Sequence, residues 1–407
     1  MTRTEERLTD ALAARAAAVA ADSIRPLPAP EARRFRHHPA GRRWSVSVAP
    51  LAAAASIAAI TAVVAMLPHN HVPGTAMTSM PKNSALLGVA AVSASDAWAV
   101  GLVVSGRRTR PLIMRWNGAH WTRSPITTSI TKQQFLWGVA AASARDAWAV
   151  GATSDGPYIL HWTGSTWTSV PTPRLTASSE LSAVAAVSAN DAWAVGVSNG
   201  ALILHWNGSR WRDVPNPWVG DHTALYSVSA RSADDVWAVG KAGSDSLILH
   251  WNGISWTRLG GPRYDRYGSS VQSVAAVSRR LAWLVGQAKD GLPLILRWNG
   301  STLRQLPRQN PTLGGALIGV SAVPAGQAWA VGAGQHGHSP RTWIFRWQGP
   351  AWLRVPSPAW RVTGVLRAVY ALSARNAWAV GFAGFAIGNR SRGLILHWNG
   401  TSWRAVA

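Results

Sequence analysis

Between residues 85 and 407, short apolar runs alternate with polar turns, and no run shows the period of an amphipathic helix. The pattern is clearest at residues 181–188, 192–196, 202–206 and 211–214, which are rich in Val, Ile, Leu, Ala and Trp. Runs of this length bounded by Ser, Asn, Asp and Gly indicate β-strands separated by turns. The sequence therefore predicts an all-β region whose strands come in groups of four.

Two turns of this group are predicted from residue type. Ser188 and Asp191 flank the first turn, where short polar side chains bond to the local backbone. Asn207 and Gly208 lie between the third and fourth runs, and both residue types tolerate a positive φ. We therefore expect a type I′ hairpin turn at this position.

The group of four runs recurs seven times, at spacings of 44 to 50 residues. Each copy contains DAWAVG or a close variant, and its tryptophans are Trp98, Trp148, Trp193, Trp237, Trp283, Trp329 and Trp378. A second string of the type LILHWNGxxW follows, with Trp116, Trp162, Trp206, Trp251, Trp298, Trp347 and Trp398. A third tryptophan comes five residues later in six copies, and Leu303 replaces it in the fifth.

Seven repeats of four short strands predict a seven-bladed β-propeller made of four-stranded antiparallel blades. Because every copy requires the same tryptophans, we interpret them as large apolar fillers between blades rather than as sugar-stacking residues. The histidines before the second tryptophan belong to different blades, so we expect hydrogen bonding rather than shared metal binding. The arginines on the predicted fourth strands are expected to protect the outer edges of the blades.

The string WAVG followed by LILHWNGxxWxxVPxP resembles the kelch repeat, and it is also similar to bacterial sialidase-type and photosystem II assembly-factor propellers. The resemblance covers about residues 85–407 and implies the propeller architecture. It implies no single activity, because propellers carry many unrelated functions. The double glycine of kelch is a single glycine here, and SANDAW does not reproduce the sialidase Asp-box.

Function is expected where the copies differ. Two residues before an unchanging valine of the first strand, the aligned copies carry unlike residues, namely Leu87, Trp137, Ser182, Tyr226, Gln272, Ile318 and Arg367. The resemblance places this strand innermost, beginning on the face that also carries the variable loops. The ligand-binding candidates are Trp137, Tyr226, Gln272, Arg367, Trp218, Trp360, Arg107 and Arg108. The alternative is that the loops are tolerant parts of a scaffold.

Residues 45–67 form 23 consecutive positions without a charge, which as a helix would be about 34 Å long and would span a bilayer. Five arginines precede this run and one lysine follows it at comparable distance, so the N-terminus is expected in the cytoplasm. We predict a short cytoplasmic segment with one helix and a basic linker at 1–43, a membrane helix at 44–67, a stalk at 68–84 and an extracytoplasmic propeller at 85–407. A cleaved signal peptide is the alternative.

The net charge of +23 suggests an anionic partner, while the absence of cysteine removes disulfides and thiolate metal sites. No glycine-rich phosphate loop or nucleic-acid motif is present. At an exterior location the expected partners are the membrane and a glycan, an anionic cell-wall polymer or a protein, with no specific nucleic acid. We expect no cofactor and no resident metal.

The leading hypothesis is therefore a membrane-anchored binding module of the plasma membrane. A glycan hydrolase or lyase is one alternative, but its chemistry needs two placed carboxylates and residues 85–407 contain a single glutamate, Glu180, with few free aspartates. An assembly or sensor protein is another. The sequence leaves the ligand, the mode of ring closure and the oligomeric state open.

Overall fold

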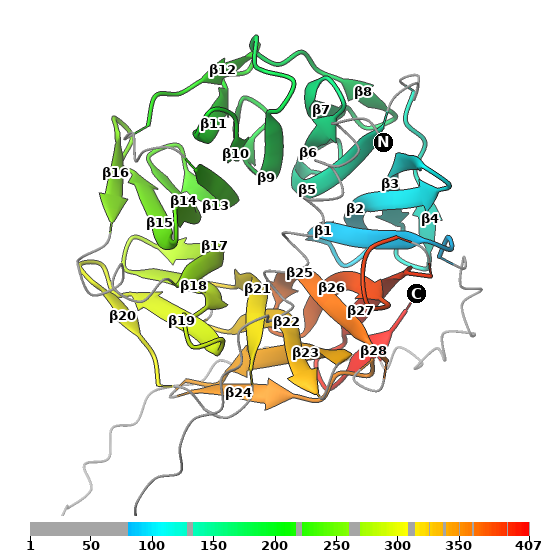
Figure 1. The fold of residues 1–407 in the computed structure, drawn as a ribbon, viewed down its shortest axis with the longest axis vertical. Coiled ribbons are helices and arrows are strands. Elements are labelled where there is room, and N and C mark those ends of the chain that lie inside the picture. Colours follow the sequence, from blue (N-terminus) through cyan, green and yellow to red (C-terminus); the bar gives the residue numbers. More distant parts are fainter. Residues whose placement is uncertain are drawn as a thin grey trace, which may run out of the picture. The chain divides into compact units, whose positions relative to one another are not determined.

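The computed structural model describes residues 80–127, 133–216, 222–259, 269–307, 314–324, 326–336, 339–349, 351–359, 362–388 and 390–406. Seven four-stranded antiparallel sheets surround a common centre, which confirms the predicted seven-bladed propeller (Figure 1). These residues contain no helix, and hence none that could cross a membrane. The predicted segments 1–43 and 44–67 lie outside the described part of the chain.

Each blade consists of four consecutive strands. The innermost strands are β1 (Ser84–Ser93), β5 (Gln134–Ser143), β9 (Glu180–Ser188), β13 (Thr223–Ser232), β17 (Ser270–Ser278), β21 (Gly315–Ala322) and β25 (Gly364–Ser373). The second strands are β2 (Asp96–Ser105), β6 (Asp146–Thr153), β10 (Asp191–Val197), β14 (Asp235–Ala242), β18 (Leu281–Gln287), β22 (Ala328–His336) and β26 (Asn376–Ala383).

The two outer positions of each blade are filled in the same chain order. The third strands are β3 (Arg108–Trp116), β7 (Gly156–Trp162), β11 (Ala201–Trp206), β15 (Asp245–Trp251), β19 (Pro293–Trp298), β23 (Ser339–Trp347) and β27 (Arg392–Trp398). The outermost are β4 (Trp121–Arg123), β8 (Trp167–Ser169), β12 (Trp211–Asp213), β16 (Trp256–Leu259), β20 (Leu303–Gln305), β24 (Trp352–Val355) and β28 (Trp403–Ala405).

The antiparallel pairing gives the ring two distinct ends. The start of each innermost strand, the hairpin between the second and third strands and the connection to the next blade lie together, for example Ser84 opposite Val103 and Ser105 opposite Arg108. We call this the upper end. The lower end carries the other two turns of each blade. The expected placement of the variable loops beside the starts of the inner strands is thus observed.

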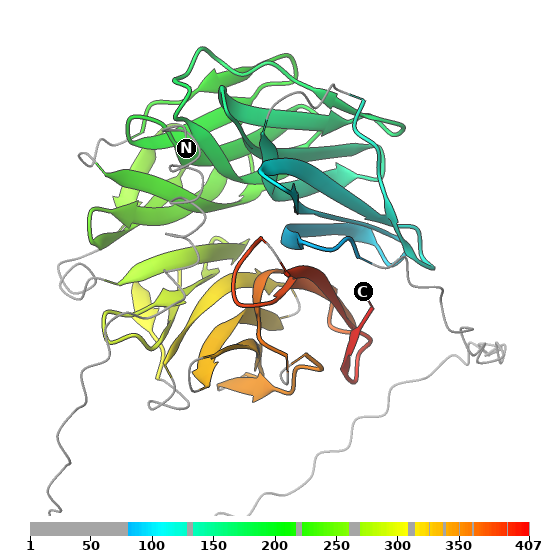
Figure 2. The ribbon, with the colours of Figure 1, turned by 45° about the vertical axis from the view of Figure 1, so that its right-hand side comes forward.

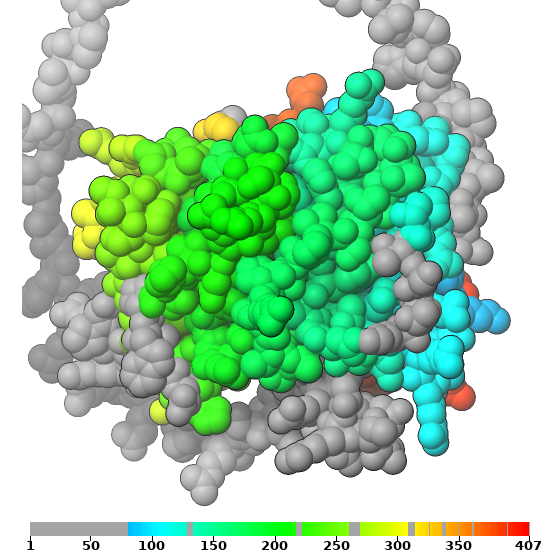
Figure 3. All heavy atoms as spheres, turned by 90° about the horizontal axis from the view of Figure 1, so that it is seen from above, coloured from blue at the N-terminus to red at the C-terminus, as the bar shows by residue number. Residues whose placement is uncertain are grey.

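The core lies between neighbouring blades and is built from the repeated tryptophans. The ring of Trp98 lies 4.8 Å from that of Trp162 and 5.1 Å from that of Trp167 in the next blade, the second pair edge to face. The same contact recurs at the other seams; at the blade 4–5 seam, where Leu303 replaces the third tryptophan, Trp237 meets Trp298. In the space-filling view the blades abut as one continuous surface (Figure 3). The interpretation of the tryptophans as filler agrees with this packing.

The hairpin after the third strand differs from the predicted type I′ turn. Gly208 has a φ of +88°, but Asn207 does not adopt a positive φ. Instead, Asn207 Oδ1 accepts hydrogen bonds from the backbone N–H groups of Ser209 and Arg210, at 3.2 and 3.1 Å. The prediction was wrong because the asparagine side chain organises a four-residue loop, which needs only one left-handed residue.

The first and last blades lie side by side and close the ring (Figures 1 and 2). Lys82, ahead of β1, forms an isolated antiparallel bridge with Arg392 of β27. The Gly393 N–H donates to Ser84 Oγ at 3.0 Å, and Met80 is buried in the cluster between the two blades. The residues before β1 therefore add to the tryptophan packing at this seam.

Candidate functional site

A β-bulge near the start of every innermost strand marks the variable position. At this bulge each blade has one residue that is skipped in the pairing with the second strand. The skipped residues are Leu87, Trp137, Ser182, Tyr226, Gln272, Ile318 and Arg367. Bulges release a residue from the ladder and redirect its side chain, and they are frequent beside functional sites. The seven unlike residues thus share one special backbone position.

The glycine of each WAVG string lies opposite this bulge. A Cβ built on Gly240 would lie 1.9 Å from the carbonyl oxygen of Ala224, a distance that no side chain tolerates. The same approach of 1.9 to 2.0 Å recurs in the other blades, at Gly101, Gly151, Gly196, Gly286, Gly332 and Gly381. The repeated glycine therefore permits the bulge that presents the variable residue.

All seven bulge residues line one central cavity of about 190 Å³. The seven valines two positions later line it as well, namely Val89, Val139, Val184, Val228, Val274, Val320 and Val369. The lining residues are the third to sixth residues of inner strands that are eight to ten residues long, so the cavity lies about midway along the ring axis. The bulge residues form the side of the cavity that faces the upper end. The propeller thus brings together side chains that are far apart in the sequence.

The chemistry of the cavity changes around the ring. Leu87, Trp137 and Ile318 are buried and belong to one apolar cluster, in which Trp137 meets Phe135 edge to face at 5.3 Å. Blades 3, 4 and 5 contribute polar residues instead, Ser182, Tyr226 and Gln272, and blade 7 contributes Arg367. Arg367 is the single charged residue of the lining, which contains no carboxylate. The cavity is suited to an anionic group beside an apolar or ring-shaped one.

The structure unites four of the eight ligand-binding candidates, Trp137, Tyr226, Gln272 and Arg367. Trp137 is only 5% exposed, so its ring forms part of the apolar wall rather than standing free in the mouth. Tyr226, Gln272 and Arg367 are half-buried, and the Gln272 amide donates to Ser270 Oγ at 2.7 Å. Leu87, Ser182 and Ile318 also line the cavity, as their membership of the variable column could have indicated.

The other four candidates lie outside the cavity lining. Arg107 and Arg108 are exposed at the β2–β3 hairpin, at the same upper end. Trp218 and Trp360 fall outside the described residues. The structure therefore places the two arginines at the upper end but outside the cavity, and leaves the two tryptophans as predictions.

The repeated histidines and aspartates form pairs within single blades. Nε2 donates to the facing oxygen in His161–Asp146, His205–Asp191, His250–Asp235 and His397–Asn376, at 2.8 to 3.0 Å. Arg115 pairs with Asp96 in the same way, and its guanidinium lies 4.8 Å above the ring of Trp98. The expected structural role of these histidines is confirmed. No group of three metal-ligating side chains occurs in the described part of the chain.

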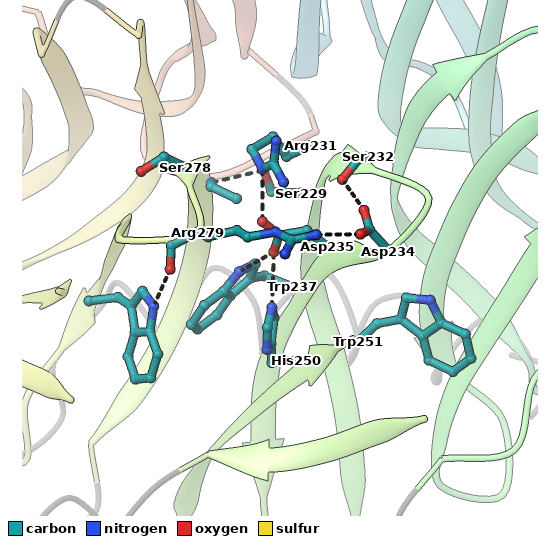
Figure 4. A network of polar contacts seen from close by, with 12 residues as sticks. Ser229, Arg231, Ser232, Asp234, Asp235, Trp237, His250, Trp251, Ser278 and Arg279 are labelled. Atoms are coloured by element: carbon teal, nitrogen blue, oxygen red, sulfur yellow. Dashed lines mark hydrogen bonds and ion pairs between the residues drawn. The ribbon is translucent and has the colours of Figure 1, made fainter. Parts of the chain in front are cut away.

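Asp235 is the centre of the largest of these networks (Figure 4). Its oxygens accept hydrogen bonds from Arg231 Nε at 2.8 Å, His250 Nε2 at 2.9 Å and Trp237 Nε1 at 3.2 Å. Burial disfavours the charged carboxylate, but the hydrogen bonds from Arg231 and His250 outweigh it, so the pKa of Asp235 lies below its ordinary value. Beside it, Asp234 pairs with Arg279 of blade 5. The network thus joins two blades at the lower end, away from the cavity.

The six fourth-strand arginines are exposed on the outermost strands, as expected for edge protection, and are Arg123, Arg212, Arg258, Arg304, Arg354 and Arg404. They lie on the rim and not at the cavity.

The sequence matches no protein-family model. No curated protein matches it either. Among solved structures, YCF48 bound to D1 peptide is similar at 15% identity and a TM-score of 0.56, over 79% of this chain and 95% of that one. The GH74 xyloglucanase from Xanthomonas campestris is similar at 14% identity and a TM-score of 0.58, over 81% of this chain and 55% of that one.

The β-propeller domain of the Trilobed protease from Pyrococcus furiosus, whose structure shows an open velcro topology, is similar at 8% identity and a TM-score of 0.52, over 81% and 97% of the two chains. Identities this low support the fold alone. The resemblance to sialidase-type and assembly-factor propellers is therefore supported for the architecture. The kelch pattern and the membrane anchor remain predictions.

Proposed function

We propose that this protein is a membrane-anchored, extracytoplasmic binding module whose ligand docks at the upper end of the propeller, over the central cavity. The observation that carries the proposal is the bulge column. Seven blades share the same core, yet the residues at the bulge differ in every blade and all line one cavity. A scaffold that holds unlike side chains around one opening is the arrangement expected of a recognition site.

The ligand class follows from the lining. Arg367 on blade 7 supplies a cationic group, while Leu87, Trp137 and Ile318 supply an apolar wall and Tyr226 and Gln272 supply hydrogen-bonding groups. We therefore propose an anionic ligand, either an acidic glycan, an anionic cell-wall polymer or an acidic protein segment. The fold is compatible with both kinds of partner, since the similar YCF48 structure contains a bound peptide and a similar propeller is a xyloglucanase.

The location rests on residues 45–67. We propose that this uncharged run anchors the chain in the plasma membrane with the N-terminus inside. The hydrolase or lyase alternative is less well supported at the cavity, because the lining residues include no Asp or Glu to act as general acid or nucleophile. The assembly or sensor alternative rests on no specific observation.

Binding can be tested with a panel of candidate ligands. The solubilised full chain is applied to arrays of neutral glycans, acidic glycans and acidic peptides, and the retained probe is titrated. We expect Tyr226→Ala, Gln272→Ala and Arg367→Ala together to remove binding while the thermal midpoint stays close to that of the parent. Trp137 is left unchanged, because its truncation would disturb the apolar wall. Retention that is unchanged in the triple variant would place the site elsewhere.

A further inference from the structure

A cluster of exposed basic residues lies at the upper end of blade 1 and of its seam with blade 7. We call this cluster the basic corner; its members are Lys82, Arg107, Arg108, Arg110, Arg390 and Arg392. Asn83 holds its parts together, since the Asn83 carbonyl accepts the Val104 N–H and its Oδ1 accepts the Arg390 N–H, both at 2.8 Å. The backbones of Lys82 and Arg392 also form an isolated antiparallel β-bridge. The cluster is therefore built by three segments that are distant in the sequence.

No carboxylate side chain offsets this charge on the two blades. Residues 291–407 contain no Asp or Glu. The one acidic residue of blade 1, Asp96, lies at the lower end and pairs with Arg115. On blades 2 to 5 the upper end carries Asp155, Glu180, Asp245 and Asp290 among its basic residues. Among the described residues, the upper end is thus charged asymmetrically, with its most positive part at blade 1 and its seam with blade 7.

Two exposed apolar side chains lie beside the basic corner. Phe385 is 70% exposed and Val362 is 50% exposed. The Gly384 N–H donates to the Thr363 carbonyl at 2.7 Å, which brings the neighbours of these two residues together. Ala383 pairs directly with Arg392, so Phe385 lies close to the cluster. Helices that lie in the membrane interface combine Lys and Arg with exposed aromatic and aliphatic side chains. The same combination of residue types is present on this surface.

The chain also enters the propeller at this point. Met80 is buried in the apolar cluster of the seam and Lys82 belongs to the basic corner. Twelve residues separate position 67, where the uncharged run ends, from Met80, and they reach at most about 45 Å even when fully extended. A bilayer that holds the uncharged run is therefore always within reach of the basic corner.

We propose that the basic corner docks on the anionic surface of the bilayer in which the chain is anchored, with its arginines at the lipid phosphates and Phe385 in the interface. This inference rests on the proposed membrane anchor. It adds an orientation: the upper end of the ring is drawn toward the bilayer, so the ligand of the cavity lies at the membrane surface. Ionic strength weakens such docking, because exposed charges are screened.

The absence of cysteine makes a direct test possible, because a single introduced cysteine is labelled uniquely. Phe385→Cys carries an environment-sensitive fluorophore at the basic corner. Ile254→Cys, at a lower-end turn and 85% exposed, carries the same fluorophore as a control. The full chain is reconstituted into phosphatidylcholine vesicles with or without phosphatidylglycerol. We expect a blue shift for the first label only, and only in the vesicles that contain phosphatidylglycerol.

Variants that remove positive charges show whether the blue shift of the fluorophore at position 385 is caused by docking. Lys82→Gln, Arg390→Gln and Arg392→Gln together are expected to abolish the shift. The matched change at the outer edges, Arg123→Gln, Arg304→Gln and Arg404→Gln, is expected to retain it. A label at position 385 that responds equally to both kinds of vesicle, or that ignores the first triple change, would overturn the inference and leave an acidic protein as the partner of this surface.

Carbonate extraction of the same vesicles distinguishes the two proposals. A chain that is removed by carbonate would refute the anchor, and the docking inference with it. A chain that resists carbonate but shows no shift would refute the docking inference alone.

Discussion

The indole rings of Trp378 and Trp121 lie 5.1 Å apart at an interplanar angle of 90°, although one belongs to the last blade and the other to the first. The pair Trp148–Trp211 at an internal seam has almost the same geometry, 5.1 Å and 87°. The ring therefore closes with the same contact that joins its interior blades. No outer strand has to be exchanged between the ends of the chain.

If the ring closes through this contact, loss of a tryptophan should destabilise the protein equally at the two seams. Trp378→Ala and Trp148→Ala should each lower the free energy of unfolding by about 3–5 kcal/mol, because each removes a fully buried ring. Ile254→Ala, at an exposed turn, should leave it almost unchanged. Thermal or denaturant unfolding measures all three. A much smaller loss for Trp378→Ala would mean that residues 80–84, and not the tryptophans, hold the seam.

The close packing of the glycine opposite the bulge predicts that adding one methyl group there strongly destabilises the fold. Gly240→Ala should destabilise the protein by about 1–3 kcal/mol or more, since the new Cβ would overlap the Ala224 carbonyl. Gly314→Ala is the control: its nearest neighbour lies at 3.8 Å and its backbone is not left-handed, so its effect should stay within about 0.5 kcal/mol. Comparable unfolding midpoints for the two variants would argue against the steric role of the repeated glycine.

The lowered pKa of Asp235 predicts that the folding stability of the protein falls at acidic pH. Because the pKa of Asp235 is lowered in the folded protein, its contribution is complete above the ordinary carboxyl pKa and is lost as the pH falls through the lowered value. Asp235→Asn should cost about 1–3 kcal/mol at neutral pH, since it weakens a charge-assisted hydrogen bond from Arg231. The difference from the parent should shrink in acid. Melting curves at pH 7 and near pH 3 would show a constant difference if the charge played no part.

The repeated side-chain pairs can be tested by changing the partner of His397 from Asn to Asp. Burial lowers the pKa of His397, and its partner is the neutral Asn376, whereas the other three repeated histidines pair with Asp. The parent therefore loses stability as the pH falls through the lowered pKa of this group. Asn376→Asp should raise the pKa of His397, because a carboxylate favours the charged imidazole. Titration of its ring signals by NMR measures this, and an unchanged or lower pKa would contradict the pairing.

The sequence was sufficient for the architecture. The short apolar runs and the fixed recurrence of Trp98 and its equivalents define seven four-stranded blades, and the replacement of the third tryptophan by Leu303 identifies the one altered seam. These features are local or repeat at a constant interval, so a single sequence displays them. The hydrogen-bonding role of His205 followed from the same periodicity, but its partner did not: Asp191 was expected to bond to the local backbone and instead accepts from His205.

The details of the site depend on contacts between residues that are far apart in the sequence. The variable column could be aligned from sequence, but nothing in the run around Tyr226 reveals that this residue leaves the ladder at a bulge. Trp137 shares its buried cluster with Phe135 and with side chains from blades 1, 6 and 7. The basic corner unites Lys82, Arg108 and Arg390 through contacts of Asn83 across the seam. Such long-range contacts leave no pattern along the chain.

The most direct test of the binding role compares two arginines of the same blade. Arg367 lies in the cavity lining at the bulge of β25, whereas Arg375 is exposed at the lower-end turn after β25. The dissociation constant of the array-selected ligand is measured for Arg367→Ala and Arg375→Ala. We predict a loss of about tenfold or more for Arg367→Ala, since a charge-assisted hydrogen bond contributes about 1.5–3 kcal/mol, and no change for Arg375→Ala. Equal affinities for the two variants would contradict a binding site at the cavity.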